Sequence, residues 1–95
     1  MTKSFTELAI QRKILLAAVD EARNVRRGYE IERTVDLFDW QTVTWWWGRL
    51  GTHGSRKTRA FATEDQAVAF VRHLLMRRAT APRRVGVAYC LRSPH

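Results

Sequence analysis

Three consecutive tryptophans run directly into a glycine-spaced basic segment, and this concentrates groups that could bind a ligand. Trp45, Trp46 and Trp47 are followed at once by Gly48 and Arg49. A tryptophan can stack on a flat partner, and an arginine can hold a phosphate through two hydrogen bonds. These residue types at this spacing predict a surface for a ligand with flat and anionic parts.

The candidate binding residues begin at the tryptophan run and continue into the basic residues that follow it. They form a predicted nucleic-acid contact set: Trp47, Arg49, Arg56, Lys57, Arg59, Arg83 and Arg84. Structural alternatives stay open, because Trp47 could be a core residue and Arg49 could stack on a neighbouring tryptophan. The other cations could be an ordinary solvated surface. We favour phosphate contact for Arg49 because three further cations follow it closely.

The sequence contains no set of residues suited to catalysis, metal binding or cofactor binding. His53 and His73 lack a cysteine or carboxylate at metal-ligand spacing, and Cys90 has no histidine near it in the sequence. Residues 51–54 could present backbone N–H groups to a phosphate or could simply form a turn. Their spacing matches neither the Walker A nor the dinucleotide pattern. We therefore expect a protein that is not an enzyme and binds no cofactor or metal.

The net charge of +8 is unevenly distributed along the 95 residues. Residues 1–39 contain equal numbers of acidic and basic side chains, so the whole excess lies in residues 40–95. Such asymmetry predicts a polyanionic partner, DNA or RNA first, although a merely basic surface is the alternative. The single cysteine cannot form an internal disulfide, and no targeting or membrane-spanning stretch is visible. We expect a cytoplasmic protein without a membrane partner.

Hydrophobic periodicity predicts the elements that position these residues. Residues 5–25 have helical spacing, with Gly28 as the stop, and strands are expected over 29–37, 40–47 and 55–62. A second helix should begin at the T-x-x-Q capping box of Thr63 and reach about Arg78, followed by a strand over 85–91. The order predicts an α+β fold, an antiparallel sheet of about four strands with one main helix packed on it, plus an N-terminal helix.

The domain organisation expected from these elements has three parts. Residues 1–28 would be an N-terminal amphipathic helix, residues 29–92 the main domain, and residues 93–95 a disordered tail. Within the second predicted strand, Val43, Trp45 and Trp47 share one face and Trp46 lies on the other.

From Tyr29 onward the sequence resembles the WGR domain, a family named for its Trp-Gly-Arg tripeptide. The matching positions are Tyr29, Leu37, Phe38, Trp47, Gly48, Arg49, Leu50, Gly51, Gly54, Phe61 and the start of the following helix. The resemblance implies an antiparallel sheet with one main helix. In poly(ADP-ribose) polymerases the domain binds DNA near strand breaks, where the motif tryptophan packs on sugar and the motif arginine joins DNA or interdomain contacts.

Small stand-alone bacterial proteins are similar to this sequence, which has no room for an ADP-ribosylating domain. The resemblance therefore implies only the binding half of that activity. We expect a nucleic-acid-binding module, DNA first, that contacts phosphates, with strand ends as a further target that the resemblance implies. The alternative is a protein–protein adaptor that uses exposed aromatic residues and the N-terminal helix. The sequence leaves the oligomeric state open.

Overall fold

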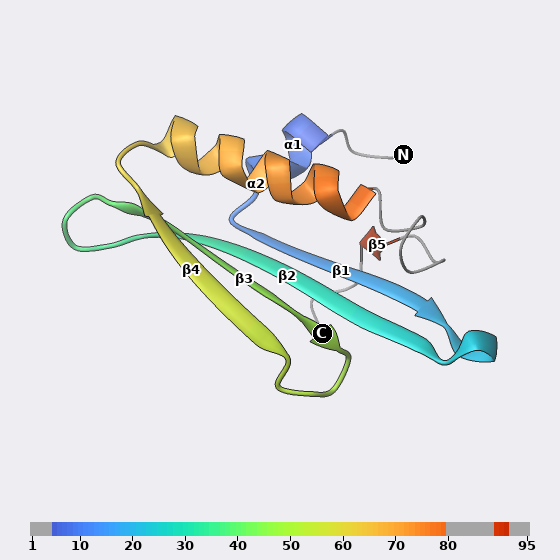
Figure 1. The fold of residues 1–95 in the computed structure, drawn as a ribbon. Coiled ribbons are helices and arrows are strands. Elements are labelled where there is room, and N and C mark those ends of the chain that lie inside the picture. Colours follow the sequence, from blue (N-terminus) through green and yellow to red (C-terminus); the bar gives the residue numbers. More distant parts are fainter. Residues whose placement is uncertain (1–4, 80–88, 92–95) are drawn as a thin grey trace.

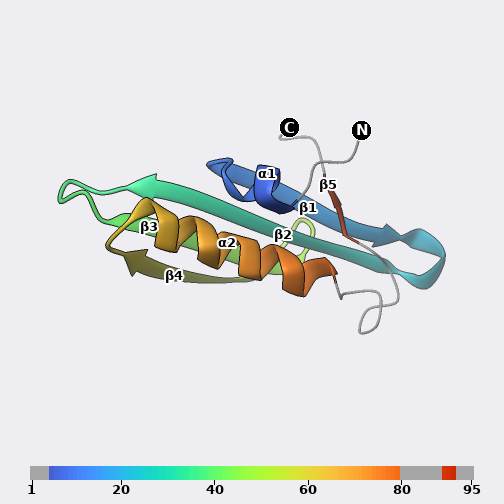
Figure 2. The same ribbon diagram turned by 90° about the horizontal axis from the view of Figure 1, so that it is seen from above.

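The computed structural model describes residues 5–79 and 89–91 and shows an antiparallel sheet with its helices on one face (Figures 1 and 2). The sheet has five strands in the order β4-β3-β2-β1-β5. In chain order the elements are α1 (Phe5–Ala9), β1 (Lys13–Asp20), the 3-10 turn η1 (Glu21–Arg23), β2 (Val25–Val35), β3 (Gln41–Arg49), β4 (Ser55–Phe61), α2 (Glu64–Ala79) and β5 (Cys90–Leu91). The α+β class with one main helix is confirmed, with five strands in place of about four.

The long N-terminal helix predicted over residues 5–25 is wrong. The helix α1 ends at Ala9, and Lys13–Asp20 forms β1, which pairs with β2 along its whole length. Its apolar run fits both a helical period and an alternating one, so local pattern could not separate the two. Pairing decides the outcome, because Ile14, Leu16 and Ala18 then point into the core. Gly28, the expected helix stop, lies inside β2.

The central hairpin agrees with the prediction apart from its ends. β2 and β3 pair in register, with Tyr29 opposite Trp47 and Gly28 opposite Gly48. β4 continues the sheet beyond β3, with Lys57 opposite Trp45 and Arg56 opposite Trp46. Because side chains alternate along a strand, neighbouring residues of this segment face opposite sides of the sheet.

The helix α2 covers one face of the sheet, here called the helix side. The predicted cap is present in a shifted form: Gln66 N donates to Thr63 Oγ1 at 3.2 Å, while Gln66 Oε1 accepts from Ala62 N, one residue before the cap, at 3.2 Å. The first bond satisfies an N–H group that the helix start leaves without a partner, and the second ties the preceding residue to the helix. The buried residues of the helix recur at helical spacing, at Ala67, Val71, Leu74 and Leu75. They pack on Ile14, Leu16, Tyr29, Ile31 and Val43 of the sheet.

Arg33 is the one charged residue at an inward position of the strand predicted over residues 29–37, and it is buried with 3% exposure. Its Nη2 donates to Ile10 O at 2.8 Å, and its Nη1 lies 3.4 Å from Glu64 Oε1. The guanidinium therefore ties the segment after α1 to the start of α2.

Several predictions fall on residues outside the described part of the chain. They are Arg83, Arg84, most of the strand expected over 85–91, and the tail over 93–95. Of that strand, the structure describes β5, which pairs with β1.

Candidate functional site

Trp46 lies on the face of the sheet opposite α2, here called the outer face. A Cβ atom added to Gly28 would come within 2.8 Å of the Trp46 ring, and one added to Gly54 within 2.6 Å of it. The Trp46 Nε1–H donates to the His53 carbonyl oxygen. The spaced glycines thus make room for a flat tryptophan ring, and the turn after β3 is closed against that ring.

Trp45 and Trp47 lie on the helix side, as the alternation predicted. Trp45 packs edge-on against Phe70, with ring centroids 5.1 Å apart. Trp47 is half-buried, packs against the core and lines two cavities. One part of its ring therefore belongs to the core, while another part borders space that a ligand can enter.

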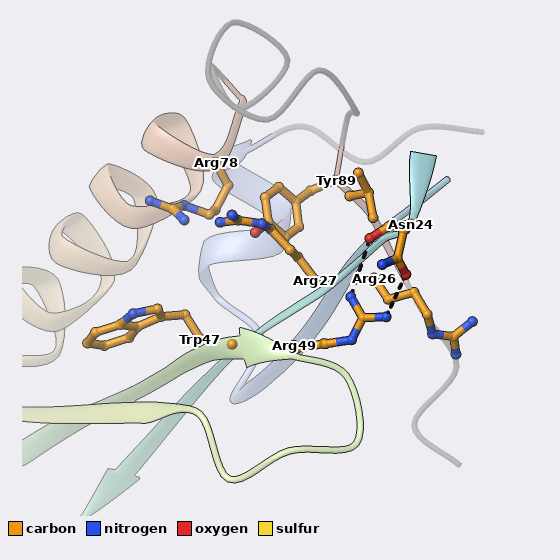
Figure 3. A pocket seen from close by; sticks show the side chains of 9 residues that line it. Asn24, Arg26, Arg27, Trp47, Arg49, Arg78 and Tyr89 are labelled. Carbon is orange, nitrogen blue, oxygen red and sulfur yellow. Dashed lines mark hydrogen bonds between the residues drawn. The ribbon is translucent and has the colours of Figure 1, made fainter. Parts of the chain in front are cut away.

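The first cavity, here called the end cavity, has a volume of about 520 Å³ and lies where β2 begins and β3 ends, beside Arg78 and Tyr89 (Figure 3). Four arginines line it, namely Arg26, Arg27, Arg49 and Arg78. None of the described residues lining it is acidic. Arg26 is paired with Glu21 at 2.9 Å, so Arg27, Arg49 and Arg78 supply the charge that faces this space.

Arg49 of the Trp-Gly-Arg tripeptide is exposed but held in place. Its Nη2 donates to Asn24 Oδ1 at 2.8 Å, and its Nη1 to Asn24 O at 3.3 Å (Figure 3). Asn24 has a positive φ of 54°, a conformation that asparagine tolerates better than most residues. Two hydrogen bonds leave further N–H donors of the guanidinium for a ligand.

Arg78 lies between the end cavity and a second one. Its guanidinium carbon is 4.6 Å from the centre of the Tyr29 ring and 5.8 Å from that of Tyr89. Its Nε is buried and has no hydrogen-bond partner among the described residues. Burial raises the pKa of Tyr29 to about 12, against the pull of the Arg78 and Arg77 charges. Arg78 is therefore a cation fixed by aromatic rings with donors to spare.

The second cavity, here called the helix cavity, has a volume of about 560 Å³ and runs between α2 and the strands β3 and β4. Its charged lining consists of Lys57, Arg59, Arg77 and Arg78, and none of the described residues lining it is acidic. Arg59 lies 5.3 Å from the centre of the Phe61 ring and 5.5 Å from that of Phe70. Trp47 and Arg78 line both cavities, so the two spaces adjoin each other.

The outer face has a different balance of charge. Its cavity of about 290 Å³ is lined by Lys13 and Arg56, but also by Glu30 and Glu32. Lys13 lies 3.9 Å from Glu32. The basic run predicted as one surface is therefore divided, because Lys57 and Arg59 face the helix side and Arg56 faces the outer side.

Sequence reasoning missed three residues of the helix side, Arg27, Arg77 and Arg78. Arg27 was assigned to a helix in the electrically neutral part of the chain, and the strand pairing places it opposite Arg49, in the cavity that Trp47 also lines. Arg77 and Arg78 were visible only as the basic last turn of α2. Their proximity to the tryptophans follows from how α2 packs, which no local pattern contains.

A comparison with protein-family models establishes the family of this chain. The family model for the WGR domain matches residues 12–80. The chain belongs to the WGR domain family. The match begins at residue 12, just before β1. The resemblance seen in the sequence began at Tyr29 and so did not include this strand. A comparison with curated proteins gave no match.

The described residues of this WGR domain contain no group of three or more histidine, cysteine, aspartate or glutamate side chains that could hold a metal ion. They also contain no helix with the length and apolar character needed to cross a membrane.

Proposed function

We propose that this WGR domain binds nucleic acid, DNA first, through the helix side of its sheet, and that it is a binding module rather than an enzyme. The observation that carries the proposal is the contrast in charge between the two faces. Both helix-side cavities are lined by several cations and by none of the acidic residues described, whereas the outer-face cavity has two of each sign. A polyanion gains most beside cavities whose described lining residues include no carboxylate.

Trp47 occupies the junction of the two cavities and supplies a flat apolar contact there. Phosphates on one side would meet Arg27 and Arg49, and phosphates on the other would meet Lys57 and Arg59. A sugar or base at the junction would pack on the Trp47 ring, and stacking of a base on an aromatic ring contributes about 1–3 kcal/mol. This division of roles agrees with the part that the WGR resemblance implies for the motif tryptophan.

Arg78 complements Trp47 at the same junction. Its charge is not neutralised by a carboxylate in any ion pair described, and its orientation is fixed by Tyr29 and Tyr89. A guanidinium that is already oriented loses less side-chain entropy when it binds a phosphate. Of the predicted set, Trp47, Arg49, Lys57 and Arg59 belong to the proposed surface and Arg56 does not. Arg83 and Arg84 stay predictions.

The proposal is tested by fluorescence anisotropy at low salt with a labelled nicked duplex, a blunt duplex and an RNA duplex of the same sequence. We expect submillimolar binding to at least one DNA, and tighter binding to the nicked than to the intact blunt duplex would place strand breaks among the targets. Arg78→Gln should weaken binding, while Arg56→Gln should leave it nearly unchanged. Absence of submillimolar binding to all three probes would refute the proposal, and binding to RNA alone would correct its DNA preference.

The alternative function, a protein–protein adaptor, no longer has the long N-terminal helix as a support. A different observation still supports the adaptor function, because large apolar side chains are exposed at the hairpin between β2 and β3. The cytoplasmic location also stays a prediction.

A further inference from the structure

The tip of the β2–β3 hairpin carries the most exposed large apolar side chains of the described residues. Leu37 is 97% exposed and Phe38 is 81% exposed, and Trp40 beside them is 47% exposed. Turn positions tolerate polar residues, so neither leucine nor phenylalanine is required here by backbone geometry. Neither side chain belongs to the core cluster, so both are available to a partner.

The hairpin tip is a tight three-residue loop that presents these side chains in a fixed arrangement. Asp36 N donates to Trp40 O at 3.0 Å, and Asp39 N donates to Asp36 O at 3.2 Å. The Asp36 carboxylate accepts from Phe38 N at 2.8 Å and from Trp40 N at 2.9 Å. Asp39 takes the left-handed position of the loop, with φ of 63°. A loop ordered in advance binds with a smaller entropic cost.

The surroundings of the tip are acidic. Asp36 and Asp39 flank Leu37 and Phe38 directly, and α2 begins at the same end of the molecule with Asp65 and with Glu64, which is paired with Arg33 (Figures 1 and 2). Negative charge disfavours both a nucleic acid and an anionic membrane as the occupant of this tip. It favours an apolar pocket with cations around it.

The helix cavity of this same chain has that chemistry. Trp45, Phe70 and Leu74 provide apolar walls, and Lys57, Arg59 and Arg77 provide positive charge. The tip cannot enter the cavity of its own molecule, because Trp40 and Trp45 are five positions apart on a continuous strand, about 17 Å when extended. A second copy of the chain can bring a tip to it.

We propose that the Leu37–Phe38 tip of one copy docks into the helix cavity of a second copy. This contact is heterologous, since tip and cavity are different surfaces, so each added copy leaves one tip and one cavity open. The product is a head-to-tail chain rather than a closed dimer. Because the cavity is also part of the proposed nucleic-acid surface, self-association and nucleic-acid binding compete. The self-association argument stands on the tip and cavity alone and needs no nucleic acid.

The test is sedimentation velocity on the full chain without nucleic acid, over a concentration series reaching roughly 1 mM, since small interfaces associate weakly. We expect the mean mass to rise with concentration and to fall with added salt. The tip variant Leu37→Ser/Phe38→Ser and the cavity variant Lys57→Glu should each stay monomeric. Met76→Ser removes another exposed apolar residue, of 53% exposure, and should associate like the parent chain.

Mixing the two defective variants separates this geometry from other modes of association. The tip variant keeps a working cavity and the cavity variant keeps a working tip, so the mixture should form a one-to-one complex and nothing larger. A parent chain that stays monomeric throughout, a tip variant that still associates, or a mixture without the one-to-one complex would each overturn the proposal. The tip variant keeps the whole proposed nucleic-acid surface and loses its competitor, so it should bind the duplex probes at least as tightly as the parent, and the two proposals fail independently.

Discussion

Adding a single methyl group at Gly54 should destabilise the fold far more than adding one at Gly51. Both glycines have positive φ, 59° at Gly54 and 81° at Gly51, so alanine at either site loses a favoured backbone conformation. That loss is about 1–2 kcal/mol for a residue with a Cβ. At Gly51 a Cβ would meet no heavy atom within 4 Å, so the conformational term is the whole effect.

At Gly54 the new Cβ would also press on the Trp47 carbonyl oxygen and on the Trp46 ring. Backbone cannot yield as a flexible side chain does, and forced overpacking costs about 1–3 kcal/mol. We therefore expect Gly54→Ala to lower the free energy of unfolding by about 2–5 kcal/mol and Gly51→Ala by about 1–2 kcal/mol. The difference corresponds to a further Tm decrease of roughly 4–8 °C for each kcal/mol in a domain of this size.

Thermal and urea unfolding followed by circular dichroism measure both variants, with Gly51→Ala as the matched control. A double variant with Trp46→Ala tests the cause, because removing the ring should recover part of the Gly54→Ala loss. Equal destabilisation by the two glycine variants would refute the view that the glycines seat Trp46.

Three further predictions follow from buried polar groups and backbone geometry. The folded protein holds the Tyr29 proton more tightly than the unfolded chain, with a pKa of about 12 against 10.0. The stabilisation that this proton gives is fully present below about pH 10 and is lost as the pH rises towards 12. Between these pH values the parent should lose about 2–3 kcal/mol of unfolding free energy in urea titrations that Tyr29→Phe does not lose. Arg33→Ala should cost about 1–3 kcal/mol, because the Ile10 carbonyl loses its donor, whereas the exposed Glu64→Gln should cost less than about 1 kcal/mol in the same assay. Asp39→Gly should change stability by less than about 1 kcal/mol and leave the hairpin's amide exchange protection intact, since glycine suits its positive φ.

The hairpin, β4 and α2 were predictable because their local patterns are unambiguous. The run from Trp45 to Trp47 alternates between the faces of a strand, and Thr63 with Gln66 marks a helix start. β1 was not predictable, because Ile14–Val19 is apolar at every position and no hydrophobic period can be read from it. Only the pairing with β2 selects the strand.

The candidate site was predictable in part. Alternation along the strand expected over residues 55–62 puts the Arg56 side chain on one face and the Lys57 and Arg59 side chains on the other. The division of the basic run therefore follows from the sequence alone. The contribution of Arg27 and Arg78 was not available from any local pattern. It depends on the register between β2 and β3 and on the packing of α2 across the sheet.

Lys57 and Arg56 offer the most direct test of the claim that the helix side binds nucleic acid. They are neighbours on β4, both exposed, and face opposite sides of the sheet. The measurement is the salt dependence of duplex binding for Lys57→Gln and Arg56→Gln. Loss of one phosphate contact reduces the slope of log K against log salt by about 0.9. We predict that reduction for Lys57→Gln and an unchanged slope for Arg56→Gln. The opposite pattern, or equal effects, would contradict the account.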